Sequence, residues 1–389
     1  MRSARCFDEN IDRHCMSVLI LSYPSDFHAA VVEWTLTRKF GLDASTIFAP
    51  NFPDSDTYSM HFRAVVGTTL MAEVSHNATK LTPKVVWRRR LTSPSSSIHA
   101  HPDDAEFISR ENRKFVDGCW SLLSSEAFWI NDHLNATRAN SKAFQLRAAS
   151  QTGWHIPDTL MSNDPGEIRD FVRQGESIYK PFMASVWKVS GGSTFTPMTT
   201  KVSIDQLNND NQLHGCAGIF QRLIDKSYEL RITIFGRACF AMKLHSQDKL
   251  DTALDWRVGF YGSIQIEQVE LPPQISEACF ALMDRLGLVF GAIDVAVTKD
   301  GQYFFFEINE MGQFLWVEDM CADVPMLSAF CGFLASADPK YQYREKSPVW
   351  SIQKARNDAE FVEYFKSRQA GNAEFLPGNF YNERAVANE

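Results

Sequence analysis

The stretch 288–320 constrains the fold of this chain more than any other. It contains two apolar runs separated by Lys299-Asp300-Gly301. An Asp-Gly pair between alternating apolar segments is a strong signal for a β-hairpin. If Asp300 and Gly301 form a two-residue loop, the strands pair antiparallel and Lys299 lies opposite Gln302. The stretch therefore predicts a hairpin with a defined register.

Counting outward from this turn places Asp294 directly opposite Glu307, and Asn309 projects from the same face because it lies two residues further along. Like charges in directly opposed positions destabilise a sheet. Two carboxylates and an amide oxygen therefore predict a bound cation, and a set of oxygen ligands favours Mg²⁺. The alternative is a hairpin with a hydrated charged face. The aromatic run at 303–306 instead indicates a buried strand, in which carboxylates need partners.

Composition and charge exclude several classes of function. The chain has 389 residues, enough for two or three domains, with ordinary contents of hydrophobic (44%) and charged (22%) residues. A formal charge of −8 offers no basic field for nucleic acid or anionic lipid. No apolar run is long enough for a transmembrane helix, and the N-terminus lacks the apolar region of a secretory signal. Eight cysteines without C-x-x-C spacing indicate reduced thiols in a cytoplasmic protein.

The first part of the chain alternates strands and helices. Residues 1–15 are predicted to be a disordered extension, and a start at Met16 instead of Met1 stays open. Residues 16–130 are then predicted to form an open α/β domain. Its expected elements are a strand at 17–21, an amphipathic helix at 29–40, a strand at 85–87 and a helix at 106–125. We interpret Arg88-Arg89-Arg90 as a solvated strand end, with one arginine in a ligand cleft as the alternative.

The rest of the chain is expected to form two further domains and a tail. Residues 131–217 would hold a helix at 139–149 that carries Lys142, a helix begun by the cap Asp164, and a strand at 177–181. The segment 190–194 could approach a phosphate or could be a flexible hairpin tip. Residues 218–338 would form a meander of strands at 219–224, 229–235 and 238–244, a helix at 275–286, the hairpin, and a helix at 325–335. Residues 339–389 would add a helix at 358–368 and a tail.

Several cationic side chains at element ends suit phosphoryl chemistry, which depends mainly on positioning and charge neutralisation. They are Lys142, Lys180, Arg231 and Arg257. The chain has no Walker A sequence, no kinase Gly-rich loop and no H-R-D loop. It thus carries the cations for a nucleotide without the most common nucleotide motifs.

Together, these motifs resemble the ATP-grasp superfamily. The resemblance lies in their order: a lysine that precedes a helix, then Ile178-Tyr179-Lys180-Pro181, Phe220-Gln221-Arg222-Leu223-Ile224, Glu229-Leu230-Arg231-Ile232-Thr233, Asp255-Trp256-Arg257, and Asp294 with Glu307-Ile308-Asn309. Residues 156–165 and 307–314 further resemble the microviridin-type peptide maturases, or graspetide synthetases. The resemblance covers about residues 17–335. It implies an α/β (α+β) protein with an N-terminal pre-ATP-grasp domain, a central lid domain and a C-terminal antiparallel-sheet domain.

The resemblance also implies roles for individual residues around an ATP molecule held between two lobes. Lys142 and Lys180 would contact the phosphates, with Lys180 also near the adenine. Gln221 and the backbone of Leu223 would meet the adenine edge, and Glu229 would accept hydrogen bonds from the ribose. Gln221 stands where many ATP-grasp enzymes carry Glu, and either side chain can accept from the adenine amino group.

The remaining implied residues surround the reacting groups. Arg257 would hold the γ-phosphate or the acyl phosphate, and Arg231 would reach the phosphate or the substrate carboxylate. Two Mg²⁺ ions would be bound by Asp294, Glu307 and Asn309. The pair Glu310-Met311 replaces a more usual Pro-Asn type pair, so the substrate side of the pocket is less defined.

The implied reaction activates an Asp or Glu side chain of a ribosomal precursor peptide as an acyl phosphate. A Thr or Ser hydroxyl or a Lys amine then displaces phosphate and gives a lactone or a lactam. The implied partner is a precursor peptide with a leader, for which residues 185–215 could form part of a lid and a docking surface. A homodimer is left open.

Two other functions stay open at this point. One is an ATP-grasp carboxylate–amine ligase that acts on a small molecule, a free amino acid or a protein tail. The other is a nucleotide- or peptide-binding module without catalysis. ATP turnover triggered by a free amino acid would favour the first, and absence of ADP release with any acceptor would favour the second.

Overall fold

The computed structural model describes residues 17–48, 51–63, 71–90, 94, 97–125, 127–183, 187–188, 194–195, 198–259, 264–344 and 350–370. The expected extension 1–15 and the segment 190–193 therefore lie outside the described residues. No helix in the described ranges is long and apolar enough to cross a membrane.

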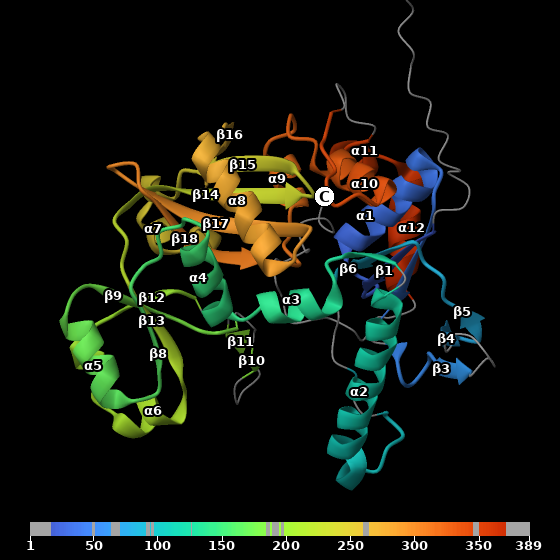
Figure 1. The fold of residues 1–389 in the computed structure, drawn as a ribbon, viewed down its shortest axis with the longest axis horizontal. Helices are drawn as coiled ribbons and strands as arrows, with labels where there is room; N and C mark the ends of the chain where they lie inside the picture. The colour runs from blue at the N-terminus through green and yellow to red at the C-terminus, as the bar shows by residue number, and fades with distance from the viewer. Residues whose placement is uncertain are drawn as a thin grey trace, which may run out of the picture.

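A four-stranded parallel sheet organises the first part of the chain, as predicted (Figure 1). Its order is β2-β1-β6-β7, made of Asp43–Phe48, Ser17–Ser22, Val85–Arg88 and Phe128–Ile130. The long helix α2 (Ala105–Ser124) connects β6 to β7. A separate antiparallel sheet holds β3 (Tyr58–Arg63), β4 (Met71–His76) and β5 (Thr79–Lys80).

The helix that follows β1 differs from its predicted amphipathic character. It comprises α1 (Phe27–Thr35) and a π-helical turn (Leu36–Phe40) that ends at Gly41, where φ is 68°. Every residue of α1 except Glu33 is buried. A helix that is apolar on all sides needs cover on all sides, and the C-terminal tail supplies part of it, as the neighbouring α1 and α12 in Figure 1 show.

The tail is an ordered part of the fold up to Ala370. It forms α11 (Ile352–Arg356) and α12 (Ala359–Ala370), close to the helix predicted at 358–368. The ring of Phe361 lies 5.8 Å from that of Phe27, and Arg368 pairs with Glu33 at 2.8 Å. The tail therefore completes the core of the N-terminal sheet instead of projecting away from it.

The second sheet is antiparallel and lies apart from the first (Figure 1). Its order β12-β9-β13-β8 comprises Thr200–Val202, Ser177–Lys180, Gly218–Arg222 and Thr159–Ser162. Helices α5 (Pro165–Arg173), capped by Asp164 as predicted, and α6 (Asp210–Gly215) accompany it. Short strands β10 (Trp187–Lys188) and β11 (Thr194–Phe195) form a separate pair.

Strand β13 departs from the prediction because it is not part of the following meander. It pairs with β8 on one side and β9 on the other. Its Phe220 packs with Ile168 and Val172 of α5 in a small core of this sheet. The sheet therefore extends to Arg222, beyond the expected limit at residue 217, and brings Gln221 with it.

The helix that carries Lys142 lies on the C-terminal sheet instead of the second one. The expected helix at 139–149 is two helices, α3 (His133–Ala139) and α4 (Lys142–Gln151), with Ser141 as the cap of α4. Ala148 and Ala149 share a core with Ile293 and Phe305. The structure thereby separates Lys142 from Lys180 in the fold, although both face the same space.

The C-terminal sheet is antiparallel with the order β16-β15-β14-β17-β18. These strands are Ile266–Val269, Ala238–Leu244, Lys226–Phe235, Phe290–Thr298 and Tyr303–Asn309. One face is covered by α4 and by α8 (Pro273–Leu286), as Figure 1 shows. The remaining elements are α7 (Leu250–Leu254), the 3₁₀ helix η7 (Trp256–Gly259), α9 (Leu315–Met320) and α10 (Met326–Ser336).

The predicted two-residue hairpin loop is wrong, yet the predicted opposition of Asp294 and Glu307 is confirmed. The Gly301 N–H donates to the Thr298 carbonyl, so the loop has three residues and ends at Gly301 with φ of 79°. This shifts the register by one. A β-bulge at Phe306 shifts it back, because Val295 pairs with Phe305 while Asp294 still pairs with Glu307. Two deviations from a regular hairpin thus cancel.

Candidate active site

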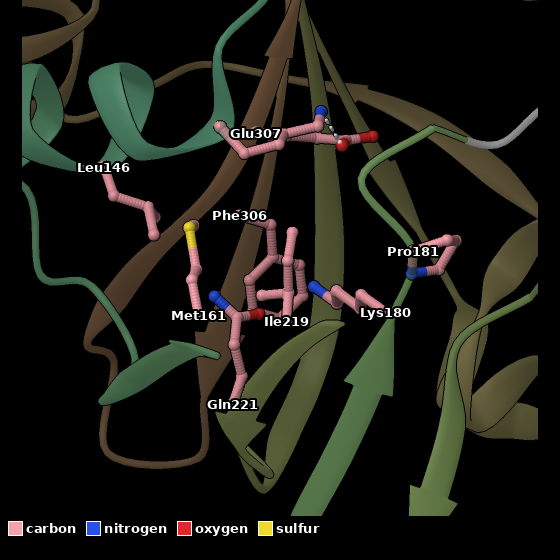
Figure 2. Close-up of a pocket in the computed structure, with 9 residues that line it drawn as sticks. Leu146, Met161, Lys180, Pro181, Ile219, Gln221, Phe306 and Glu307 are labelled. Atoms are coloured by element: carbon pink, nitrogen blue, oxygen red, sulfur yellow. Dashed lines mark hydrogen bonds and ion pairs between the residues drawn. The ribbon is translucent and has the colours of Figure 1, made fainter. Parts of the chain in front are cut away.

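A cavity lies where the second sheet meets α4 and β18 of the C-terminal body. Its lining combines residues from both parts: Lys142, Leu146, Met161, Lys180, Pro181, Ile219, Gln221, Phe306 and Glu307. Figure 2 shows Lys180 and Gln221 extending from the second sheet toward the ring of Phe306. The Phe306 bulge therefore places an aromatic ring in the cavity.

The carboxylate of Glu307, which lines the cavity, and that of Asp294 opposite it in the sheet are each paired with a cation. Arg231 Nη1 donates to both oxygens of Asp294 at 2.9 Å. Lys142 Nζ lies 2.5 Å from Glu307 and lowers the pKa of Glu307 to about 2, although burial opposes this shift. Burial raises the pKa of Asp294, and the charge of Arg231 opposes that increase. Both carboxylates are therefore neutralised by cations of the protein.

The donor set fits a magnesium site in its chemistry. Asp294, Glu307 and Asn309 offer only oxygens, which a hard cation prefers. The Asn309 side chain is exposed, and its Oδ1 accepts from the Met311 N–H at 3.1 Å. Within the described ranges, no group of three or more His, Cys, Asp and Glu side chains is arranged to hold a metal. A metal here would need ligands from the nucleotide as well.

Lys180 is the second cation that lines the cavity. Its Nζ lies 4.5 Å from the centre of the Phe306 ring. Burial lowers the pKa of Lys180 to about 8, while the carboxylates of Glu307 and Glu229 oppose the shift. The ammonium is therefore poorly solvated, and a bound phosphate would stabilise its charged form.

Gln221 presents a free acceptor at the edge of the cavity. Its side chain is 3% exposed, and Nε2 donates to Thr159 Oγ1 at 2.9 Å. Among the residues that the structure describes, none donates to Gln221 Oε1. A buried acceptor of this kind needs a donor, and an adenine amino group would supply one. The Leu223 N–H, in contrast, already donates to the Glu176 carbonyl at 3.0 Å, and Leu223 does not line the cavity.

The expected ribose acceptor, Glu229, is almost completely buried and belongs to an ion pair. Its Oε1 lies 2.8 Å from the Nζ of Lys226, a residue that the sequence analysis missed. In the sequence the two residues are three apart, which in a regular strand places them on opposite faces. The only available signal was the proximity of a lysine to a predicted functional glutamate.

Two arginines lie near Asp294 and Glu307 and come from different elements. Arg257, in η7, donates to Asp255 from Nε at 2.8 Å and from Nη2 at 2.6 Å, and its charge also lowers the pKa of Glu307. Arg231 lies directly opposite Asp294 in the sheet and also donates to the Gln313 carbonyl. Of the predicted site residues, Lys142, Lys180, Gln221 and Glu307 line the cavity. Those that do not line it are Leu223, Glu229, Arg231, Arg257, Asp294 and Asn309.

The arginine triplet after β6 is not a solvated strand end. Arg89 is 1% exposed, pairs with Asp26 at 3.1 Å and donates to the Met311 carbonyl at 2.9 Å. Arg88 lies 3.8 Å from Glu310. These arginines connect the N-terminal domain to Glu310 and Met311, the two residues that follow Asn309.

Comparison with solved structures defines the class of this protein. The chain matches no protein-family model, and no curated protein matches it. Its fold is the ATP-grasp fold, as the sequence predicted, because an ATP-grasp ligase of Chryseobacterium gregarium matches 83% of the chain. The VanG D-Ala:D-Ser ligase of Enterococcus faecalis also matches 83% of the chain, over 99% of its own length, with a TM-score of 0.50 and 12% identity.

Within that class the likeness is greater to ligases of ribosomal peptides. Macrocyclase MdnC of Microcystis aeruginosa MRC, solved with precursor peptide MdnA, has a TM-score of 0.69 and 26% identity, over 82% of this chain and 100% of MdnC. The RiPP-associated ATP-grasp ligase of Chryseobacterium gregarium was solved with ADP and a leader and core peptide. It has a TM-score of 0.73 and 24% identity, over 83% of this chain and 98% of the Chryseobacterium ligase. The predicted resemblance is thus confirmed.

Proposed function

We propose that this chain is an ATP-dependent ligase that closes rings in a ribosomal precursor peptide. One observation supports the proposal: Glu307, which lies opposite Asp294 in the sheet, lines a cavity together with Lys142 and Lys180. Such a set of charges is suited to a nucleotide and its metal. The likeness to MdnC, a macrocyclase solved with its precursor peptide, supports a peptide as the substrate.

The residues divide into two groups around the reacting phosphate. Lys142 and Lys180 would bind the nucleotide phosphates, Gln221 the adenine and Glu229 the ribose. Mg²⁺ ions, held by Asp294, Glu307 and Asn309, would supply charge neutralisation of the phosphates. The Leu223 carbonyl is left as the only backbone group of that residue for the adenine edge, because the N–H is already used.

The two arginines would act on the peptide carboxylate and the γ-phosphate. Arg257 would hold the transferring phosphoryl group, and Arg231 the carboxylate. In the first step a carboxylate oxygen attacks the γ-phosphorus and ADP leaves. In the second, a Thr or Ser hydroxyl or a Lys amine attacks the acyl carbon, phosphate leaves, and the attacking group loses its proton. The peptide loses one water per ring.

A peptide substrate is favoured over a free amino acid. The likeness falls from a TM-score of 0.69 and 26% identity with MdnC to 0.50 and 12% with a D-Ala:D-Ser ligase. A leader-bearing precursor is therefore the proposed partner, and the cytoplasm, where ATP and new precursor peptides are present, is the proposed location. The described cysteines are all free, which agrees with a reducing compartment.

The direct test incubates the full chain with a precursor peptide encoded beside its gene, ATP and Mg²⁺, and follows the peptide by mass. The expected result is loss of one water for each ring, together with ADP release, and neither event with the Asp294→Asn variant. Release of ADP only with a free amino acid would favour the small-molecule ligase. No mass change with any neighbouring peptide would contradict the proposal.

A further inference from the structure

A buried lysine holds the glutamate that the proposed function assigns to the ribose. Lys226 Nζ lies 2.8 Å from Glu229 Oε1 and donates to the Leu254 carbonyl at 3.2 Å. Each of the two charged side chains is only 6% exposed. Burial raises the pKa of Glu229, and the charge of Lys226 opposes this shift. Without the lysine, Glu229 would be a buried carboxylate that has lost the ammonium in contact with it and keeps only the Ser246 hydroxyl and the more distant charge of Lys180.

A local irregularity of β14 makes this pair possible. Lys226 pairs with Thr298 of β17, but Tyr228 pairs with Val297, so Ser227 is an extra residue in the strand. Residues three apart normally face opposite sides of a sheet. The bulge at Ser227 shifts this alternation by one and turns Lys226 to the side of Glu229. Bulges that re-aim side chains are common beside active sites.

The same ammonium group lies between two parts of the nucleotide site. Its Nζ is 5.7 Å from the centre of the Phe306 ring, over which Lys180 also lies. The carbonyl that it binds belongs to Leu254, the last residue of α7. The next residue, Asp255, holds Arg257 through two side-chain hydrogen bonds. Lys226 thus connects the Glu229 carboxylate to the backbone that presents Arg257.

We propose that Lys226 is a positioning residue of the nucleotide site. It keeps the Glu229 carboxylate charged and oriented for the ribose hydroxyls, and it fixes the backbone that precedes Asp255 and Arg257. It contacts neither the nucleotide nor the peptide. This inference rests on the proposed function, because it requires a nucleotide ribose beside Glu229.

A positioning role and a merely structural role predict different binding data. If Lys226 only stabilises the fold, its loss weakens the binding of ADP and the binding of 2′-deoxy-ADP by the same factor. If it positions Glu229, its loss removes the preference for the nucleotide that has the 2′-hydroxyl. A hydrogen bond to a charged group contributes about 1.5–3 kcal/mol, so the wild-type chain is expected to prefer ADP by about tenfold or more.

The experiment is calorimetric titration of the full chain with ADP and with 2′-deoxy-ADP, in the presence of Mg²⁺. In Lys226→Met, which keeps an unbranched side chain one atom shorter and removes its charge, the preference for ADP should fall below about threefold. Lys243→Met is the matched control, because Lys243 also pairs with a glutamate, Glu267, at 2.9 Å and lies 5.0 Å from a ring, that of Tyr228. That pair is more exposed (28% and 47%), and the control should keep the wild-type preference. An unchanged preference in Lys226→Met would overturn the inference.

A double-mutant cycle keeps the test valid if Lys226→Met does not fold. The variant Lys226→Met/Glu229→Gln removes both charges and leaves no buried carboxylate. If Lys226 acts through Glu229, this double variant has the same ADP preference as Glu229→Gln alone. A further, additive loss would overturn the inference. A wild-type chain that binds no ADP would contradict the proposed function and this inference together, whereas ADP binding with unaltered preferences would overturn the inference alone.

Discussion

Of two lysine–glutamate pairs, one lines the cavity and the other has its ammonium 5.7 Å from the centre of the Phe306 ring, and the two pairs differ in their access to solvent. The pair Lys142–Glu307 has side chains that are 23% and 34% exposed, and its partners come from α4 and β18. The pair Lys226–Glu229 is 6% exposed on both sides, and both partners come from one strand. We expect the first pair to open, so that Glu307 exchanges the lysine for a metal and Lys142 binds a phosphate. We expect the second pair to persist when the nucleotide binds, because it is almost inaccessible to solvent.

The difference teaches that pairing alone does not indicate the role of a charged residue in this site. Removing one partner of a buried pair leaves an uncompensated charge, whereas a partly exposed pair is screened by water. We therefore assign Glu307 to ligand exchange and Glu229 to a fixed position. The predictions below test this distinction.

The largest expected effect is on stability and should separate the two lysines. Lys226→Met should lower the free energy of unfolding by about 3–5 kcal/mol, because buried Glu229 then loses the ammonium in contact with it. Lys142→Met should lower it by no more than about 1 kcal/mol. Urea unfolding of both variants measures this difference. Equal losses would show that the two pairs are equivalent and would remove the basis of the comparison.

A second prediction concerns the aromatic ring that the bulge in β18 places in the cavity. Stacking of a base on an aromatic side chain contributes about 1–3 kcal/mol. Phe306→Ala should therefore weaken ADP binding by about tenfold. Phe304→Ala is the control, since Phe304 lies on the same strand but does not line the cavity. Equal effects of the two changes would argue against a platform role for Phe306.

A third prediction follows from the pKa of Lys180, which burial lowers to about 8 from the usual 10.5. Bound phosphate favours the charged ammonium, so ADP binding above pH 8 should take up a proton, and affinity should fall by up to about tenfold per pH unit above that value. The Lys180→Arg variant stays charged, so its ADP affinity should not change with pH in this range. Between about pH 8 and 10.5 the unfolded chain binds the extra proton, so Lys180 makes stability rise with pH in this range. Calorimetry in buffers of different ionisation enthalpy measures the proton uptake.

The smallest effect is expected at Gln221, whose Oε1 already lacks a donor. Gln221→Glu keeps an acceptor for the adenine, so ADP affinity should stay within about threefold, and the Thr159 hydroxyl, which donates to the Pro157 carbonyl, has to turn to pair with the carboxylate. Gln221→Met removes the acceptor and should cost about 1 kcal/mol, or roughly fivefold. If both variants bind ADP equally well, Gln221 does not contact the adenine.

The sequence was sufficient to predict those features of the fold that depend on regular strand and helix geometry. Strand and helix order, the cap at Asp164 and the opposition of Asp294 and Glu307 follow from local patterns, although the last held only because a bulge corrected a wrong loop length. Bulges depend on tertiary packing and leave no clear sequence signal. The one at Ser227 is the reason that Lys226 was missed.

Long-range packing accounts for the other differences. Phe220 could cover either sheet, and the core beneath α5 determined that β13 joins the second one. The burial of Arg89 likewise depends on Asp26 and the Met311 carbonyl, which lie far from it in the sequence. A pattern of three arginines cannot show that such partners exist.

The central claim is that Asp294 and Glu307 exchange their protein cations for Mg²⁺ when a nucleotide binds. The most direct test is the affinity of the full chain for ADP with and without Mg²⁺, measured by calorimetry for the wild type and for Asp294→Asn/Glu307→Gln. We predict that Mg²⁺ strengthens ADP binding at least about tenfold in the wild type and has no effect in the double variant. The same strengthening in both proteins would contradict the account.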